Sequence, residues 1–180
     1  MRISNVLKYV ITLSVFLTTG CYHSVDINFN RVPNPGVYIP FPTEGVWQAY
    51  GCNAPLQARR FVRPTINSSL PTEPADFPYP VAANTGYGGV LQVCDLQGTP
   101  RAYDLSCPIE CQRDITVTVD YGTNLAKCPK CGSTYDIFVL EGNSALAGAP
   151  VSGPAMVSGY GLRRYNVVFG VDGRYALITN

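Results

Sequence analysis

The cysteines constrain this chain more than any other feature of its sequence. Four of the seven lie in two short motifs, CPIEC at residues 107–111 and CPKCG at residues 128–132. In the second motif, a Cys-x-x-Cys turn closed by glycine lets backbone amides point at sulfur. A C-x-x-C motif paired with a C-x-x-x-C motif indicates a metal site, although not one specific to iron. The sequence therefore predicts metal-binding loops within residues 106–136. The candidate ligands are Cys107, Cys111, Cys128 and Cys131.

The first 20 residues have the features of a secretion signal. Two basic residues accompany a short apolar run, residues 9–17, and small residues close the segment. The run is shorter than the roughly 20 apolar residues of a membrane span. Cys21 follows Thr-Thr-Gly, which resembles a relaxed bacterial lipobox, so we expect lipid on Cys21 and a tether over residues 21–24. Ordinary secretion with a free Cys21 thiol is the alternative.

This N-terminus places the expected protein in the bacterial cell envelope, held to the membrane by lipid and facing the periplasm or the outside. The chain has 13 basic and 12 acidic residues, and the basic ones are scattered apart from the pairs Arg59-Arg60 and Arg163-Arg164. Binding to phosphate backbones requires clustered Lys and Arg. The charge pattern therefore argues against a nucleic-acid partner.

Short apolar segments separated by turn residues dominate the sequence after residue 86. No sustained apolar spacing of three and four residues occurs after residue 20, so no long amphipathic helix is expected. The fold class predicted is all-β, a sandwich or small barrel. The expected strands are 90–94, 102–105, 115–119, 135–140, 162–169 and 174–178. The expected turns are Gln97-Gly98, Glu141-Gly142-Asn143 and Asp172-Gly173.

The N-terminal part of the mature chain is less regular. Residues 25–30 alternate apolar and polar side chains, which predicts a first strand. Residues 41–80 contain seven prolines and should form an extended, loop-rich insertion without long helices or central strands. Trp47 and Phe61 are expected to point inward and to fix part of it. The expected domain thus covers residues 25–180.

The segments 106–136 and 153–155 resemble the cluster-binding half of a Rieske domain. In that family each of two loops gives one Cys and one His, and a third, proline-containing loop covers the site. The second loop here is similar to the family pattern CPxHGSxYD in all but the histidine. The resemblance extends over about residues 89–180. It implies an antiparallel Rieske-like β-sandwich or small barrel with a cysteine-loop, cluster-binding subdomain.

The resemblance also assigns roles to individual residues. Cys107 and Cys128 match the positions that bind the buried iron. Ser133 and Tyr135 match hydroxyls that hydrogen-bond the cluster, and Pro154 belongs to the covering loop. The implied cofactor is a 2Fe-2S cluster, and the implied activity is one-electron transfer with a redox protein partner.

Both family histidines are missing from this chain. Ile109 and Cys131 stand at their positions, and the single histidine, His23, lies two residues from the proposed lipid site. A cluster with two His and two Cys ligands therefore cannot form, and the raised potential of a Rieske centre is not expected. Cys111 can supply the fourth ligand if the first loop bends.

Three states of the four cysteines remain open from the sequence. Four thiolates can hold a 2Fe-2S cluster, or they can bind a structural Zn(II) ion. Alternatively, no metal is bound and disulfides close the loops, with Cys52 and Cys94 as another pair, since the envelope is oxidising. The last two states describe a non-redox structural or binding module. The sequence shows no GxSxG nucleophile motif and no histidine for acid-base chemistry outside the tether, so no catalytic residue is predicted.

Overall fold

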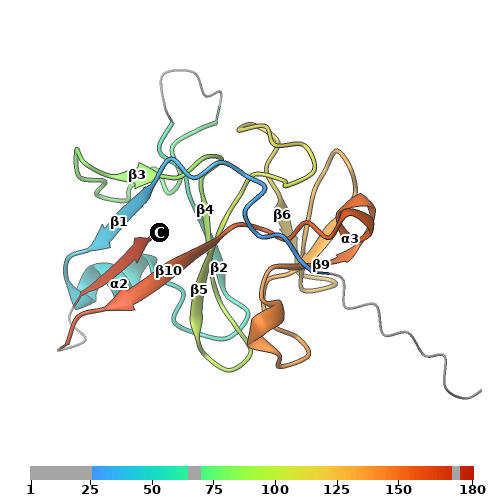
Figure 1. The fold of residues 1–180 in the computed structure, drawn as a ribbon. Helices are drawn as coiled ribbons and strands as arrows, with labels where there is room; N and C mark the ends of the chain where they lie inside the picture. The colour runs from blue at the N-terminus through green and yellow to red at the C-terminus, as the bar shows by residue number, and fades with distance from the viewer. Residues whose placement is uncertain (1–25, 65–69, 172–174) are drawn as a thin grey trace, which may run out of the picture.

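The fold consists of two antiparallel β-sheets that lie side by side (Figure 1). It is taken from a computed structural model that describes residues 26–64, 70–171 and 175–180. The predicted secretion signal, Cys21, His23 and the predicted turn at residues 172–173 lie outside the described residues. The prediction of an all-β fold is confirmed.

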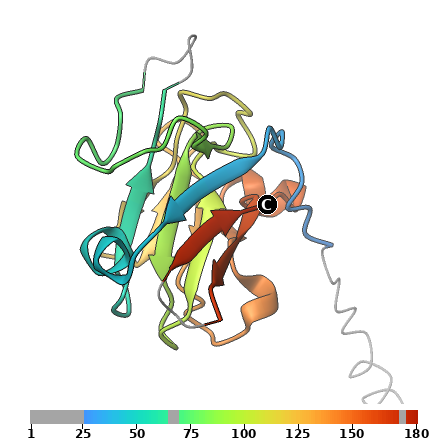
Figure 2. The ribbon, with the colours of Figure 1, turned by 90° about the vertical axis from the view of Figure 1, so that its left-hand side faces the viewer.

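The larger sheet has seven strands in the order β2-β4-β5-β10-β11-β1-β3 and is nearly closed into a barrel (Figure 2). Its β4–β5 hairpin turns at Gln97-Gly98, as expected, and Gly98 there has a φ of 81°. The strands are β1 (Val37–Phe41), β2 (Ala58–Phe61), β3 (Asn84–Thr85), β4 (Val90–Cys94), β5 (Pro100–Asp104), β10 (Arg164–Phe169) and β11 (Ala176–Thr179).

The smaller sheet has four strands in the order β6-β7-β8-β9 and carries the cysteine loops. The first loop connects β5 to β6, and the second connects β7 to β8. A short 3-10 helix, η1 (Ser144–Leu146), precedes β9, and the helix α3 (Pro154–Ser158) follows it. The strands are β6 (Thr118–Asp120), β7 (Leu125–Lys127), β8 (Thr134–Asp136) and β9 (Ala149–Ser152).

Two clusters of buried hydrophobic side chains stabilise these sheets. One fills the barrel and is rich in aromatic rings, including Phe41, Trp47 and Phe61, so the predicted inward positions of Trp47 and Phe61 are confirmed. The other lies between the sheets. It combines Leu91 of β4 with Tyr135 of β8 and includes the sulfur-bearing side chains of Cys107 and Cys128. Cys107 and Cys128 are therefore part of the core that joins the two sheets.

The proline-rich segment is more ordered than the sequence indicates. It contains the helix α2 (Glu44–Tyr50), whose first turn is capped by the Thr43 hydroxyl accepting from the Val46 amide, and it contains β2. Both elements fit between prolines. The helix is short enough to end before Pro55, and β2 lies at the sheet edge, where nearby prolines remove no ladder bond.

The prediction of a first strand at residues 25–30 is wrong for residues 26–30, which the structure describes. Asn28 forms only an isolated parallel bridge with Tyr160. The strand that enters the large sheet is β1 instead, even though it contains Pro40. Its neighbour β3 pairs only with Val37 and Tyr38, so the rest of β1 has one open edge, where proline is tolerated.

The expected strand at residues 135–140 ends early, because β8 stops at Asp136. Val139 has a φ of 57°, which an extended strand does not allow, and the Asp136 carboxylate accepts the Leu140 amide. Ile137 and Phe138 are nevertheless fully buried. The apolar pattern reflects burial in a bend rather than pairing in a sheet.

The boundaries of the remaining strands differ modestly from the predicted ones. The segment predicted at 115–119 is reduced to β6, preceded by an isolated bridge between Ser106 and Thr116. The strands β7 and β9 were not expected, because each is only three or four residues long. Short strands carry too little apolar alternation to be distinguished from loops.

A buried carboxylate fixes the start of the first cysteine loop. Asp104, at the end of β5, accepts the amides of Tyr87 at 2.9 Å, Gly88 at 3.1 Å and Ser106 at 2.7 Å, and the Tyr165 hydroxyl at 2.7 Å. Burial raises the pKa of the Asp104 carboxyl, and the four donors oppose that shift. Because Ser106 precedes Cys107, this network positions the first candidate ligand.

We expect Asp104→Ala to lower the free energy of unfolding by about 2–4 kcal/mol, because it leaves buried amides without an acceptor. Tyr165→Phe removes one donor and should cost only about 1 kcal/mol. Urea unfolding followed by circular dichroism measures both. The exposed Asp114→Asn serves as control, and equal stabilities for Asp104→Ala and this control would contradict the assignment.

Candidate metal centre

Three of the four predicted ligands come together in space. The sulfur atoms of Cys107, Cys128 and Cys131 all lie within 4.8 Å of one another, and those of Cys107 and Cys131 are 3.6 Å apart. Cys107 and Cys128 are fully buried, whereas Cys131 is partly exposed. The three thiols form a group that can bind a metal ion, with one side toward solvent.

The second loop folds tightly because of its hydrogen bonds and its glycine. The Cys128 amide donates to the Ser133 carbonyl at 2.9 Å, and the Gly132 amide donates to the Cys128 carbonyl at 3.1 Å. Gly132 has a φ of 72°, a left-handed conformation that glycine adopts without strain. This turn directs the thiols of Cys128 and Cys131 to the same side.

The first loop makes a similar turn but directs only one thiol to the site. The Cys111 amide donates to the Cys107 carbonyl at 2.9 Å. Lys130 of the second loop forms an ion pair with Glu110 of the first, with 2.7 Å between Nζ and Oε2. This ion pair was not predicted from the sequence, although the two motifs carry residues of opposite charge that could have indicated it. Such a surface pair contributes little stability.

Cys111 is not part of the sulfur group. Its thiol lies 3.1 Å from the Pro108 carbonyl oxygen and 3.8 Å from that of Arg31. Its backbone has a φ of 48°, which is unusual for a residue other than glycine and turns the side chain away from the other three. The predicted fourth ligand therefore lies outside the cluster in this structure.

Two hydroxyl groups contact the sulfurs. The Tyr135 hydroxyl is 3.4 Å from the Cys107 sulfur, and the Ser133 hydroxyl is 3.2 Å from the Cys131 sulfur. Ser133 also accepts the Ala155 amide at 3.0 Å, which ties the start of α3 to the second loop. Gly153 packs so closely that a Cβ there would lie 2.9 Å from the Ser133 Cα. Pro154, the first residue of α3, is exposed beside this contact.

The surroundings give the thiols different acidities. Burial raises the pKa of Cys107 to about 12, although the Tyr135 hydroxyl favours the thiolate. Burial also acts on Cys131, but hydrogen bonds from the Ser133 hydroxyl and amide, together with the neighbouring thiols, outweigh it and lower its pKa. The pKa of Tyr135 is raised by burial and by Cys107, so this residue stays a proton donor to sulfur. Cys131 therefore becomes a thiolate at lower pH than Cys107.

The other two described cysteines lie on the barrel side. Cys52 and Cys94 are buried free thiols, and the Cys52 thiol is 3.4 Å from the Gln92 carbonyl oxygen. Burial raises the pKa of Cys52 to about 12. Among the described residues no pair of cysteines is joined by a disulfide.

Comparisons with known proteins give no family for the chain: no family model, curated protein or solved structure matches it. Within the described residues, no helix is long and apolar enough to cross a membrane.

In the metal-free, reduced chain we expect iodoacetamide to modify Cys131 at lower pH than an ordinary cysteine, because its thiolate forms earlier. Cys107 should stay unmodified until strongly alkaline pH. Ser133→Ala removes a hydrogen bond to the thiolate and should move the Cys131 midpoint upward. Mass spectrometry of digested samples across the pH range measures each site. Equal reaction of Cys107 and Cys131 near pH 7 would contradict the expected order.

Proposed function

We propose that this chain is a metal-binding protein whose centre is held by Cys107, Cys128 and Cys131. The observation that carries the proposal is the mutual sulfur separation of no more than 4.8 Å. In a tetrahedral thiolate site with metal-sulfur bonds of about 2.3 Å, neighbouring sulfurs are about 3.8 Å apart. The three thiols therefore need only small movements to bind one ion.

A Rieske-like 2Fe-2S cluster is the group that the family resemblance implies. Its support is the small sheet bearing both cysteine loops, the hydroxyls of Tyr135 and Ser133 beside sulfur, and the contact of Gly153 with the second loop. Such a cluster needs four protein ligands, and Cys111 would have to leave the Pro108 carbonyl to become the fourth. Three of the four implied ligands are thus grouped in the described arrangement. A bound cluster would supply one-electron transfer to a redox protein partner.

A single Zn(II) ion is the second candidate, and the sulfur geometry favours it. All three sulfurs lie close enough for one tetrahedral ion, whereas ligands on two different irons must be further apart. Water or a reoriented Cys111 would complete the coordination. The chain would then be a structural or binding module without redox activity. A disulfide between Cys107 and Cys131, whose sulfurs are 3.6 Å apart, is the metal-free alternative.

We further propose that the metal centre works near the membrane as part of an envelope lipoprotein. Asn28 donates to the Gly159 carbonyl at 2.7 Å and accepts the Gly161 amide at 3.1 Å, which fastens the N-terminal segment beside α3. A chain of seven residues from Cys21 to Asn28 spans about 25 Å at most. Lipid on Cys21 would therefore hold the smaller sheet close to the bilayer.

Metal analysis tests the centre. Protein isolated anaerobically should contain close to one metal centre per chain, and Cys107→Ala, Cys128→Ala and Cys131→Ala should each lose most of it, because each removes a ligand. Mass spectrometry for iron and zinc, acid-labile sulfide and a visible spectrum are the measurements. Cys111→Ala separates the candidates: loss of colour and sulfide indicates a cluster, whereas retained zinc indicates a single ion.

Cys94→Ala is the matched control, since Cys94 is an equally buried free thiol outside the site. It should keep the metal content of the parent protein. Wild-type protein that holds neither iron nor zinc under these conditions, or that keeps its metal in Cys128→Ala, would refute the proposed function.

A further inference from the structure

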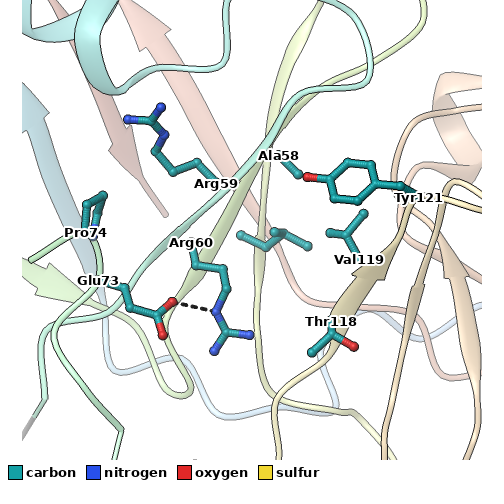
Figure 3. Close-up of a pocket in the computed structure, with 9 residues that line it drawn as sticks. Ala58, Arg59, Arg60, Glu73, Pro74, Thr118, Val119 and Tyr121 are labelled. Carbon is teal, nitrogen blue, oxygen red and sulfur yellow. Dashed lines mark hydrogen bonds and ion pairs between the residues drawn. The ribbon is translucent and has the colours of Figure 1, made fainter.

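A cavity of about 480 Å³ lies where the edge strands of the two sheets face each other. The strand β2 is at one end of the large sheet, and β6 is at one end of the small sheet. Figure 3 shows the walls: Arg59, Glu73 and Pro74 on one side, and Val119 and Tyr121 on the other. This cavity, here called the edge groove, involves none of the three clustered thiols. Its lining also includes Ala58, Arg60, Leu91 and Thr118.

The edge groove exposes unpaired backbone of β2. Val62, which follows β2, exchanges two hydrogen bonds with Glu73, at 2.7 and 2.8 Å. Backbone groups of alternate residues point to the same side of an antiparallel strand, so those of Arg60 and Ala58 face the same way as those of Val62. The bridge between Val62 and Glu73 is isolated, and the next residue of the covering segment, Pro74, has no amide to donate. Within the part of the chain that the structure describes, nothing pairs with β2 beyond this point on its outer side.

Side chains shape the edge groove into a slot with an apolar floor. Leu91 is almost fully buried beneath it. Val119 and Tyr121 form the β6 wall, and Tyr121 is 61% exposed. Arg60 closes one end. Its guanidinium donates to Glu73 Oε2 at 2.7 Å and to the Thr116 hydroxyl at 3.2 Å, so its charge is neutralised within the chain.

The second arginine of the slot is not neutralised. The Arg59 Nη1 donates to the Ala49 carbonyl at 2.9 Å, and its guanidinium lies 5.7 Å from the centre of the Tyr50 ring. No carboxylate of the described residues is within ion-pair distance of it. The edge groove therefore presents one positive charge beside its open backbone and its apolar floor.

We propose that the edge groove binds an extended peptide segment, which adds to the outer edge of β2 and places a carboxylate side chain near Arg59. The open amides and carbonyls of Ala58 and Arg60 supply the backbone ladder, as in other cases of strand addition. The alternation of side chains along a strand directs every second one toward Leu91. The cavity volume lies within the roughly 300–1,000 Å³ typical of ligand sites. The segment continues the pairing that Glu73 begins and does not depend on the metal centre.

A library of random dodecapeptides displayed on phage is the probe, selected against the full mature chain. Selected peptides should contain Asp or Glu within an extended apolar segment. Replacement of that residue by Asn or Gln should weaken binding about fivefold, since a charged hydrogen bond becomes a neutral one. Arg59→Gln should abolish this difference. Arg31→Gln should preserve it, because Arg31 lies over the Tyr160 ring and does not line the edge groove. Binding is measured by isothermal calorimetry.

Amide hydrogen exchange tests the backbone pairing directly. The amides of Ala58 and Arg60 should exchange at least about tenfold more slowly with peptide bound, while that of Arg59, already bonded to β4, should change little. Ala58→Pro removes one outward amide and should weaken binding at least about fivefold. If Ala58→Pro does not fold, exchange in the wild-type protein decides.

Three results would overturn the proposal. The first is a selection that yields no peptide with a dissociation constant below the millimolar range. The second is peptide binding that leaves the exchange of Ala58 and Arg60 unchanged. The third is binding that loses nothing when the acidic residue is neutralised. The metal content of the same samples reports separately on the thiol site, so failure of one assignment is distinguishable from failure of the other.

Discussion

The buried carboxylate of Asp104 is the interaction on which the arrangement of the site depends. Removing a carboxylate from water is costly unless donors replace the lost hydration, and here three amides and the Tyr165 hydroxyl do so. The bond to the Ser106 amide holds the chain at the point where it leaves the large sheet for the first cysteine loop. Cys107 follows directly, so its place in the core is set by the large sheet.

The cysteines differ because they are held by different parts of the fold. Cys107 and Cys128 belong to the core shared by both sheets, where close packing leaves their side chains little freedom. Cys131 packs only against the margin of that core, and its thiol depends on Ser133 for its orientation. Cys111 has no such support and bonds to local carbonyls. Metal binding would thus begin from a preformed three-sulfur set, and only the fourth ligand would require a loop movement.

The sequence predicted those features that arise from local chemistry. The β-rich fold follows from short apolar segments and their turns, and the grouping of Cys128 with Cys131 follows from the glycine-closed motif. The place of Cys111 could not be predicted, because its left-handed backbone and the nearby Arg31 carbonyl are tertiary features. The same limit applies to Ile137 and Phe138. Their apolar side chains give the pattern of a strand in the sequence, although the chain bends there.

The division into two sheets accounts for both candidate sites. The sheets share side-chain contacts through their common core, but no backbone ladder joins β2 to β6 among the described strands. A continuous sheet would close both edges, whereas the lack of a ladder between β2 and β6 leaves them open. Open backbone groups are normally satisfied by water, and a groove with apolar walls reduces that access. Arg60 reaches across the gap to Thr116 and thereby covers one end. An added extended chain would pair the remaining open backbone of β2 and replace this water.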